Sequence, residues 1–165
     1  MPARTLISVE EYLRTSYRPD CDYVDGEVVG RNMGEWDHSR LQGKLLVYLA
    51  RYEKAGCIAV PEQRVQVGAA RFRIPDICLV LGEPGEKILT KPPFLCIEVL
   101  SPEDRLSRVM VRVKEYLTMG VPYIWVFDPE TKRAYDASAG DLREVGDLLA
   151  TGDPRIEIRL AEVFA

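Results

Sequence analysis

The stretch RFRIPDICLV, residues 71–80, reads as a buried strand with an acid in its middle. Its apolar residues favour the interior of a sheet, yet Pro75 and Asp76 interrupt the run. A carboxylate in an apolar setting is costly unless another group pairs with it. The rest of the chain must therefore supply a partner for Asp76.

A second acid stands on the next apolar segment, FLCIEVL at residues 94–100. The link between the two segments, residues 82–93, is rich in glycine and proline and is predicted to be a loop. If the segments form an antiparallel hairpin, Asp76 faces Glu98. Alternation then assigns four residues to one face of the sheet and three to the other: Asp76, Cys78, Cys96 and Glu98 against Ile77, Ile97 and Val99.

Two carboxylates side by side in an apolar setting repel each other and need a shared proton or a cation. Asp76 and Glu98 suit a hard divalent ion such as Mg²⁺ or Mn²⁺, and the backbone carbonyl of Val99 could add a further oxygen ligand. The alternative is that both are ordinary strand-end acids paired with arginines. Three arginines are close enough in sequence to do so: Arg64, Arg71 and Arg73.

The remaining segments predict an α/β fold in the order helix, three strands, helix, strand. A strand–helix–strand unit with a buried second strand indicates a parallel pair inside a mixed sheet that helices cover. We expect a short helix capped by Ser8 in SVEEYL (8–13), a hairpin turning at Asp25–Gly26, a helix over 38–56, a strand over 57–67, an amphipathic helix over 103–120, a buried strand over 122–129, and edge strands in 133–138 and 155–160.

The composition limits the function classes. No apolar run reaches membrane-spanning length and the first residues lack a signal peptide's apolar core, so we expect a cytoplasmic protein without membrane contact. The four cysteines form no CxxC pair and His38 is the only histidine, which disfavours a structural zinc site and favours reduced cysteines. The net charge of −4 means that DNA binding would require a local basic patch.

Several motifs together resemble the Uma-two family of restriction endonucleases, within the PD-(D/E)xK nuclease superfamily. They are RIPDICLV, PPFLCIEVLSPEDR, KEYLTMGVP and YIWVFDP in this order, with SVEEYL, DYVDGEVV and His38 upstream. The resemblance implies a restriction-endonuclease-like fold and a single domain over 1–165, with an N-terminal helix and hairpin in 1–33, a nuclease-like core in 38–128 and C-terminal strands in 129–165. It also implies a divalent-metal site at Asp76 and Glu98 that acts on DNA.

The third catalytic group departs from the superfamily pattern. The superfamily usually has a lysine two residues after the second acid, where this chain has Leu100. The resembled family takes its lysine from the following helix, four residues before a tyrosine; counted back from Tyr116, that position holds Arg112, while Lys114 lies two residues before it. These two residues fall about 200° apart on a helix, so only one can face the acids. Alignment favours Arg112, whereas chemistry favours Lys114, because arginine stays protonated.

Further candidates surround this site. His38 either holds a phosphate or the metal, or is a helix cap or surface residue. Arg105 and Arg108 form a basic line with Arg112, which is either a DNA-contacting ridge or a solvated face. The lower-ranked candidates are Asp22, where the family usually has glutamate, Glu27, which brackets the same hairpin turn, and Glu62, which could join the metal ligands.

The sequence therefore predicts a Mg²⁺-dependent endonuclease that hydrolyses DNA phosphodiester bonds. The alternative is a catalytically weakened nuclease-fold module for nucleic-acid binding or homo-oligomeric assembly, suggested by Leu100, Arg112 and the acidic net charge. A hydrolase of another phosphate ester ranks third. A homodimer also stays open, because Tyr123, Trp125 and Phe127 alternate along a strand as core or interface residues would.

Overall fold

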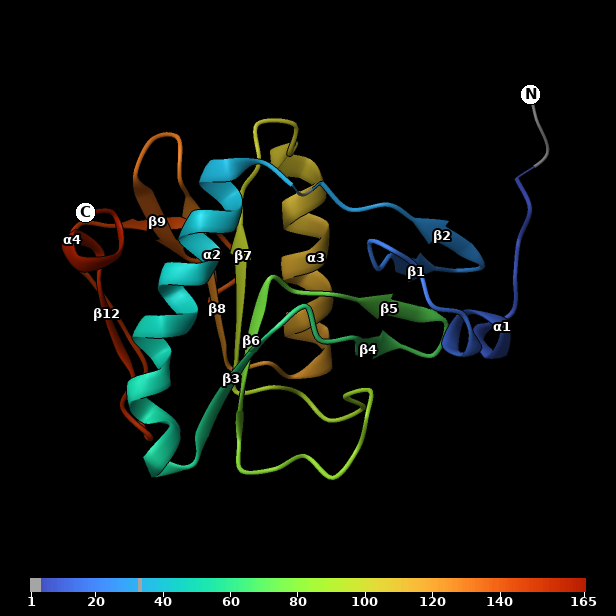
Figure 1. Cartoon of the computed structure of the whole chain (residues 1–165), viewed down its shortest axis with the longest axis horizontal. Helices are drawn as coiled ribbons and strands as arrows, with labels where there is room; N and C mark the ends of the chain where they lie inside the picture. Colours follow the sequence, from blue (N-terminus) through green and yellow to red (C-terminus); the bar gives the residue numbers. More distant parts are fainter. Residues whose placement is uncertain (1–3, 33) are drawn as a thin grey trace.

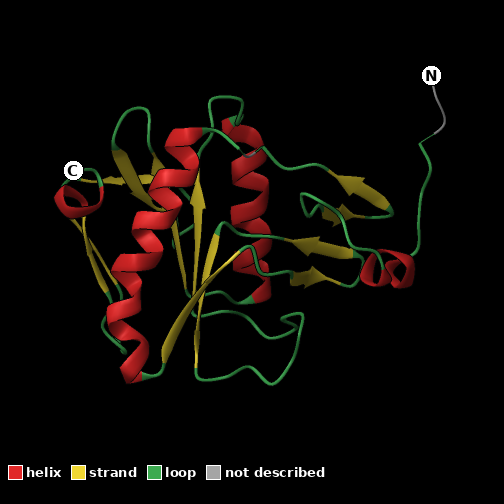
Figure 2. Ribbon diagram, in the orientation of Figure 1, coloured by secondary structure: helices red, strands yellow, loops and turns green. Residues whose placement is uncertain are grey.

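A mixed six-stranded sheet with a helix on each face forms the centre of the computed structural model, which describes residues 4–32 and 34–165 (Figures 1 and 2). Only the third and fourth strands in spatial order run parallel, and every other neighbouring pair is antiparallel. The predicted mixed sheet with an internal parallel pair is thus confirmed. In spatial order the strands are β10 (Arg143–Val145), β9 (Arg133–Asp136), β8 (Tyr123–Asp128), β7 (Leu95–Val99), β6 (Ile77–Leu81) and β3 (Cys57–Pro61).

Two helices of equal length cover the sheet, α2 (Trp36–Leu49) on one face and α3 (Leu106–Met119) on the other (Figure 1). Each buries an apolar stripe at helical spacing. Gly120 ends α3 in the left-handed conformation, with φ of 103°, as the sequence predicts. The core on the α2 side joins Leu41, Leu45 and Leu49 to Ile77, Ile97 and Val99, and the core on the α3 side joins Val109, Val113 and Tyr116 to Cys78 and Cys96.

The hairpin of β6 and β7 has the predicted register. Cys78 pairs with Cys96 and Ile77 with Ile97, so the two pairs face opposite helices. All five residues of β7 are buried, because this strand lies between two others and beneath a helix on each face. The register fixes where the flanking acids stand, since Asp76 immediately precedes β6 and Glu98 is the fourth residue of β7.

The stretch 71–80 is two strands rather than one, and the prediction of a single strand is wrong. Pro75 has no amide hydrogen to donate to a ladder, and the carbonyl of Asp76 accepts from the side chain of Gln42 at 2.8 Å. The segment 57–67 divides in the same way, at Glu62 with φ of 51°. The detached halves join a second sheet in the order β2 (Glu27–Val29), β1 (Asp22–Val24), β5 (Arg71–Arg73), β4 (Val65–Gly68).

This second sheet carries the N-terminal helix α1 (Val9–Arg14). The hydroxyl oxygen of Ser8 accepts from the amide of Glu11 at 3.1 Å, which confirms the predicted cap. The β1–β2 turn has φ of 49° at Asp25 and 98° at Gly26, the backbone that an Asp-Gly hairpin turn requires. A small aromatic core of Tyr12, Tyr23 and Phe72 holds helix and sheet together.

The C-terminal third extends the main sheet and packs beside α2. β9 lies inside the sheet because β10 pairs with its outer side, so the prediction of an edge strand there is wrong. β11 (Leu148–Ala150) pairs with β12 (Glu157–Arg159), and α4 (Leu160–Val163) follows. The helix predicted over 38–56 continues past α2 as a 3₁₀ helix, η1 (Ala50–Ala55), and ends at Gly56.

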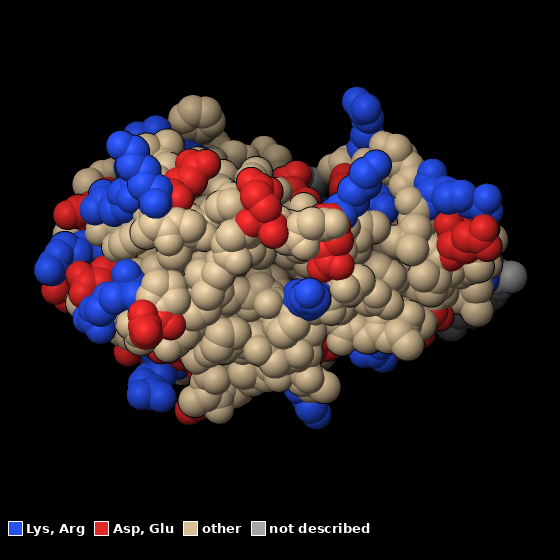
Figure 3. Space-filling model, turned by 90° about the horizontal axis from the view of Figure 1, so that it is seen from below, with Lys and Arg blue, Asp and Glu red and all other residues tan. Residues whose placement is uncertain are grey.

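Several features of the buried and exposed side chains bear on the limits that the composition sets. Within residues 4–32 and 34–165, no helix combines the length and the apolar character that crossing a bilayer requires. All four cysteines are free, and Cys57, Cys78 and Cys96 are buried. Trp125 and Phe127 are fully buried, so they are core residues. The face seen from below carries lysines and arginines among aspartates and glutamates rather than a surface of one sign (Figure 3).

Candidate active site

Asp76 lies at the end of the crossing from β5 to β6 and is held by donors from three segments. Its Oδ2 accepts from the amide of Val99 at 2.7 Å. Its Oδ1 lies 3.2 Å from Nη2 of Arg31 and 3.2 Å from Nε2 of His38. The side chain is only 7% exposed. Its carboxylate is therefore fixed in orientation, with one acceptor position left of about four.

Glu98 projects from β7 toward α3 and is also buried. Its Oε1 accepts from the hydroxyl of Tyr116 at 2.5 Å, and its Oε2 lies 3.3 Å from Nη1 of Arg112. Burial raises the pKa of Glu98 to about 7; the charge of Arg112 opposes this rise and that of Asp76 adds to it. This buried carboxyl therefore holds a proton more tightly than an exposed glutamate does, because the charge of Arg112 does not fully compensate its burial.

Asp22 brings the N-terminal hairpin into the same network. Its Oδ1 accepts from the amide of Ile74 at 3.0 Å, and its Oδ2 accepts from Nη1 of Arg73 at 3.2 Å. Nε of Arg112 lies 4.0 Å from the same Oδ2. Burial raises the pKa of the Asp22 carboxyl, while the charges of Arg112 and Arg73 oppose the rise. Asp22 thus links the second sheet to the helix that faces Glu98.

The buried network has more acids than arginines. Glu115 of α3 accepts from Nε of Arg73 at 2.6 Å, and the more exposed Arg71 binds it at 3.0 Å from outside. With His38 neutral and every acid ionised, the buried groups would carry an excess of one negative charge. They are three arginines, Arg31, Arg73 and Arg112, and four acids, Asp22, Asp76, Glu98 and Glu115.

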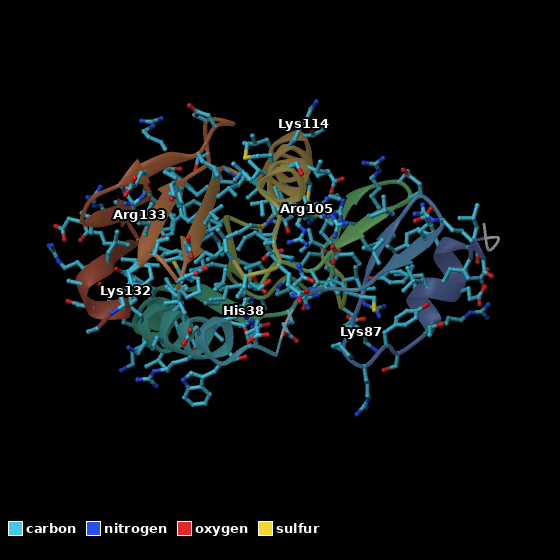
Figure 4. The ribbon with its side chains drawn as sticks, turned by 90° about the horizontal axis from the view of Figure 1, so that it is seen from above. His38, Lys87, Arg105, Lys114, Lys132 and Arg133 are labelled. Atoms are coloured by element: carbon cyan, nitrogen blue, oxygen red, sulfur yellow. The ribbon has the colours of Figure 1, made fainter. Side chains whose placement is uncertain are left out.

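His38 lies in the first turn of α2 (Figure 4), and its ring is 3% exposed, with Nε2 next to Oδ1 of Asp76. Burial disfavours its charged form, but the hydrogen bond and the charge of Asp76 outweigh this effect and raise the pKa of His38. The alternative of a helix cap or surface residue is wrong, because the ring is buried against Asp76. One turn later, Gln42 holds the carbonyl of Asp76.

Arg112, and not Lys114, faces the acids. α3 packs on the sheet through Val113 and Tyr116, which turns Arg112 toward Glu98 and leaves Lys114 on the exposed flank. Figure 4 shows Lys114 on the outer side of α3, away from His38. The expectation of Lys114 as a site residue is therefore corrected, since helix geometry admits only one of the two.

The remaining residues predicted for the site lie in different parts of the structure. Glu62 meets Asp76 through its main chain, its amide lying 3.3 Å from the Asp76 carbonyl oxygen. Glu27 pairs with Arg4 at 2.7 Å. Val99 enters the site by its amide, and its carbonyl as a metal ligand stays a prediction. Arg105 and Arg108 are exposed, at the start of α3.

The proposed pairing of the two acids with Arg64, Arg71 or Arg73 is wrong. Arg64 binds Asp20 instead, at 2.5 Å. Arg71 and Arg73 bind other acids, Asp25, Glu115 and Asp22. The acids at the hairpin therefore depend on Arg31 and Arg112, which come from outside the sheet.

Two features of the site were not predicted from the sequence: the ion pair of Arg31 with Asp76 and the hydrogen bond from Tyr116 to Glu98. Arg31 lies between β2 and α2, where no periodic pattern points to a buried side chain. Tyr116 reads as part of the apolar stripe, although its spacing of four residues from Arg112 places both on one helix face. Asn32 extends the same connection by donating to Asp104 at 3.1 Å.

The structure is that of an α/β protein with two buried acids at one end of its central β6–β7 hairpin. The crystal structure of "a putative nuclease belonging to DUF820" from Anabaena variabilis shares this fold, with a TM-score of 0.82 and 20% sequence identity over 96% of this chain and 97% of that one. The Uma2 family model, described as "Putative restriction endonuclease", matches residues 9–142. This chain belongs to the Uma2 family. A search of curated proteins gave no match.

Proposed function

We propose that this protein is an endonuclease that hydrolyses phosphodiester bonds of DNA with the help of Mg²⁺ or Mn²⁺. One observation carries the proposal: two buried carboxylates, Asp76 and Glu98, stand at the same end of the β6–β7 hairpin. His38 binds Asp76 directly, and Arg112 binds Glu98. The Uma2 family and the shared fold support a nuclease at the family level.

The residues present fit a largely hydrated divalent ion. Among the residues that the structure describes, no group of three His, Cys, Asp or Glu side chains is arranged to hold a metal ion, so any ion here would have at most two such ligands. Mg²⁺ often binds through one or two carboxylates and keeps several waters. The raised pKa of Glu98 also indicates that the positive charge beside this buried acid does not fully compensate the cost of burying it. We therefore assign Asp76 and Glu98 as the ligands, with the Val99 carbonyl as a further candidate.

The residues of this chain would have separate roles in the reaction. A bound ion would polarise the phosphate and activate water. The Val99 amide orients Asp76, and Arg112 supplies a permanent positive charge for the phosphate but no proton transfer. Because Glu98 is assigned to the ion, His38 is the group proposed to exchange a proton; its bond to Asp76 raises its pKa against the opposing effect of burial. Exposed Arg105 and Arg108 are candidates for contact with the DNA backbone.

Plasmid cleavage tests the proposal. Supercoiled plasmid is incubated with Mg²⁺ or Mn²⁺ and wild-type protein, Asp76→Asn or the surface control Lys114→Met. We expect nicking by the wild type and the control, and a loss of about a hundredfold or more in Asp76→Asn, comparable with removing a key transition-state contact. Equal cleavage by all three proteins, or none by the wild type in either metal, would refute the proposal.

A second function, nucleic-acid binding or homo-oligomeric assembly without hydrolysis, is favoured by the arginines at the acids. Arg31 already pairs with Asp76 and Arg112 with Glu98, while Lys114 points elsewhere. Calorimetry with Mn²⁺ separates the two functions. DNA binding or stable oligomers without Mn²⁺ binding would support the module, whereas Mn²⁺ binding that depends on Asp76 would support the nuclease.

A further inference from the structure

A cavity of about 340 Å³ opens between the β1–β2 hairpin and α3, beside the acids. Four of its ten lining residues are arginines, and one is an acid, Glu27. The arginines come from four different places in the chain: the N-terminal segment, β5 and two turns of α3. They are Arg4, Arg73, Arg108 and Arg112.

Acids at the back of the cavity position two of these arginines. Arg73 is held by Asp22 and Glu115, and Arg112 by Glu98. Arg112 donates only this one hydrogen bond to a described residue, although a guanidinium has five N–H groups. Its side chain is 19% exposed, so the remaining donors are accessible from the cavity.

Arg108 adds a charge that no acid compensates. It is exposed on α3, one turn before Arg112, and it takes part in no ion pair with residues 4–32 or 34–165. Arg4 contributes less, because Glu27 inside the cavity neutralises it at 2.7 Å. The uncompensated charge is therefore concentrated on the α3 wall, at Arg108 and the free donors of Arg112.

The chemistry of this lining selects a phosphate group. Guanidiniums bind phosphate oxygens through paired hydrogen bonds, and several together favour a phosphomonoester, whose charge near pH 7 is −1.5 to −2, over a phosphodiester with one charge. Three valines, Val24, Val29 and Val111, form an apolar part of the wall, and Gly30 and Asn32 complete the lining. Such a surface suits a sugar or base, and the volume is at the lower end for a small-ligand pocket.

We propose that this cavity binds the phosphorylated end of a nucleic-acid strand, with the terminal nucleotide against the valines. The inference rests on the proposed function in one respect, because it assigns a part of the substrate to the same site. Arg112 lines the cavity and also contacts Glu98, so a strand end bound here lies next to the acids. The cavity would then bind a phosphorylated strand end more tightly than an unphosphorylated one.

Fluorescence anisotropy in EDTA tests binding without cleavage. The probes are one internally labelled single-stranded oligonucleotide with a 5′-phosphate, with a 3′-phosphate or with hydroxyls at both ends. We expect the wild type to bind one phosphorylated form about tenfold more tightly than the hydroxyl form, the worth of one or two charged hydrogen bonds. The preferred form identifies the end, and competition by a nucleoside monophosphate would show that the terminal unit suffices.

Three arginine-to-alanine variants locate the effect. Arg108→Ala should reduce the preference for the phosphorylated end to about threefold or less. Arg105→Ala, which removes the same charge outside the cavity, should weaken all probes equally and keep the ratio. Arg133→Ala is the matched control on β9, far from the cavity (Figure 4), and should change nothing.

Equal affinity of the wild type for all three probes would overturn the inference, and so would a full preference in Arg108→Ala. Because these measurements contain no metal, they are independent of catalysis. A preserved preference without plasmid cleavage would overturn only the nuclease proposal, whereas cleavage without any preference would overturn only this inference.

Discussion

The main-chain amide of Val99 donates a 2.7 Å hydrogen bond to Oδ2 of Asp76 and so joins the acid before β6 to the residue after Glu98. The bond fixes the orientation of the carboxylate, because Oδ2 turns to β7 and Oδ1 is left to Arg31 and His38. Two acids 22 residues apart in sequence are thereby held at one end of one hairpin.

Arg112→Met should reduce plasmid cleavage by about a hundredfold, because it removes the positive charge beside Glu98. Arg112→Lys should keep most of the activity, since the charge remains. Lys114→Met serves as the control on the exposed flank of α3 and should cleave like the wild type. A loss in Lys114→Met as large as that in Arg112→Met would show that the wrong residue has been assigned.

Arg31→Met should bind Mn²⁺ about tenfold more tightly than the wild type. The guanidinium lies 3.2 Å from Oδ1 of Asp76 and competes there with any cation. Its Nη1 is buried without a partner among the described residues, so the arginine itself is poorly satisfied. Calorimetric titration with Mn²⁺ measures the change. Weaker binding in Arg31→Met would mean that Arg31 supports the ion instead.

Tyr116→Phe should lower the free energy of unfolding by about 1–3 kcal/mol, because it leaves a buried oxygen of Glu98 without its donor. Chemical denaturation in EDTA measures this loss. Tyr135→Phe, on β9 and outside the site, removes a hydroxyl of the same kind and should cost less. If both variants lose the same free energy of unfolding, the hydrogen bond from Tyr116 to Glu98 does not stabilise the fold more than the Tyr135 hydroxyl does.

The stability of the metal-free protein should fall as the pH rises from 5 to 8. Burial raises the pKa of Glu98 to about 7 in the folded protein, above its value of about 4.3 in an unfolded chain. The folded state therefore holds this proton more tightly, and the resulting stability is complete below pH 4.3 and is lost as the pH passes 7. The raised pKa of His38 acts in the same direction.

Glu98→Gln provides the comparison for this pH dependence. Its free energy of unfolding, measured with urea in EDTA at pH 5.5 and pH 8, should change less between the two values than that of the wild type. Identical pH dependence in both proteins would show that Glu98 does not titrate in this range.

Much of the fold was predictable because local patterns and the final packing agree. The stripe of α3, the Asp25–Gly26 turn and the pairing of Cys78 with Cys96 all follow from spacing and turn chemistry. The division of 71–80 did not follow from the same reasoning. A short apolar run looks alike whether it stays in one sheet or crosses to another, and Pro75 only marks where a break is allowed.

The site was predictable in its acids but not in its arginines. Asp76 and Glu98 stand out because carboxylates are rare in apolar strands. Arg31 lies in a connection whose path depends on how the hairpin and α2 pack, which no local pattern encodes. The choice between Arg112 and Lys114 required the rotation of α3 on the sheet, and Val113 and Tyr116 set this rotation by burial.

The central claim is that Asp76 and Glu98 together form a divalent-cation site. Calorimetric titration of Mn²⁺ into the wild type, Asp76→Asn and Glu98→Gln at pH 8 tests it most directly. We expect saturable binding to the wild type and at least about tenfold weaker binding to each variant, since each loses a charged ligand. No binding to the wild type, or equal affinity in all three proteins, would contradict the claim.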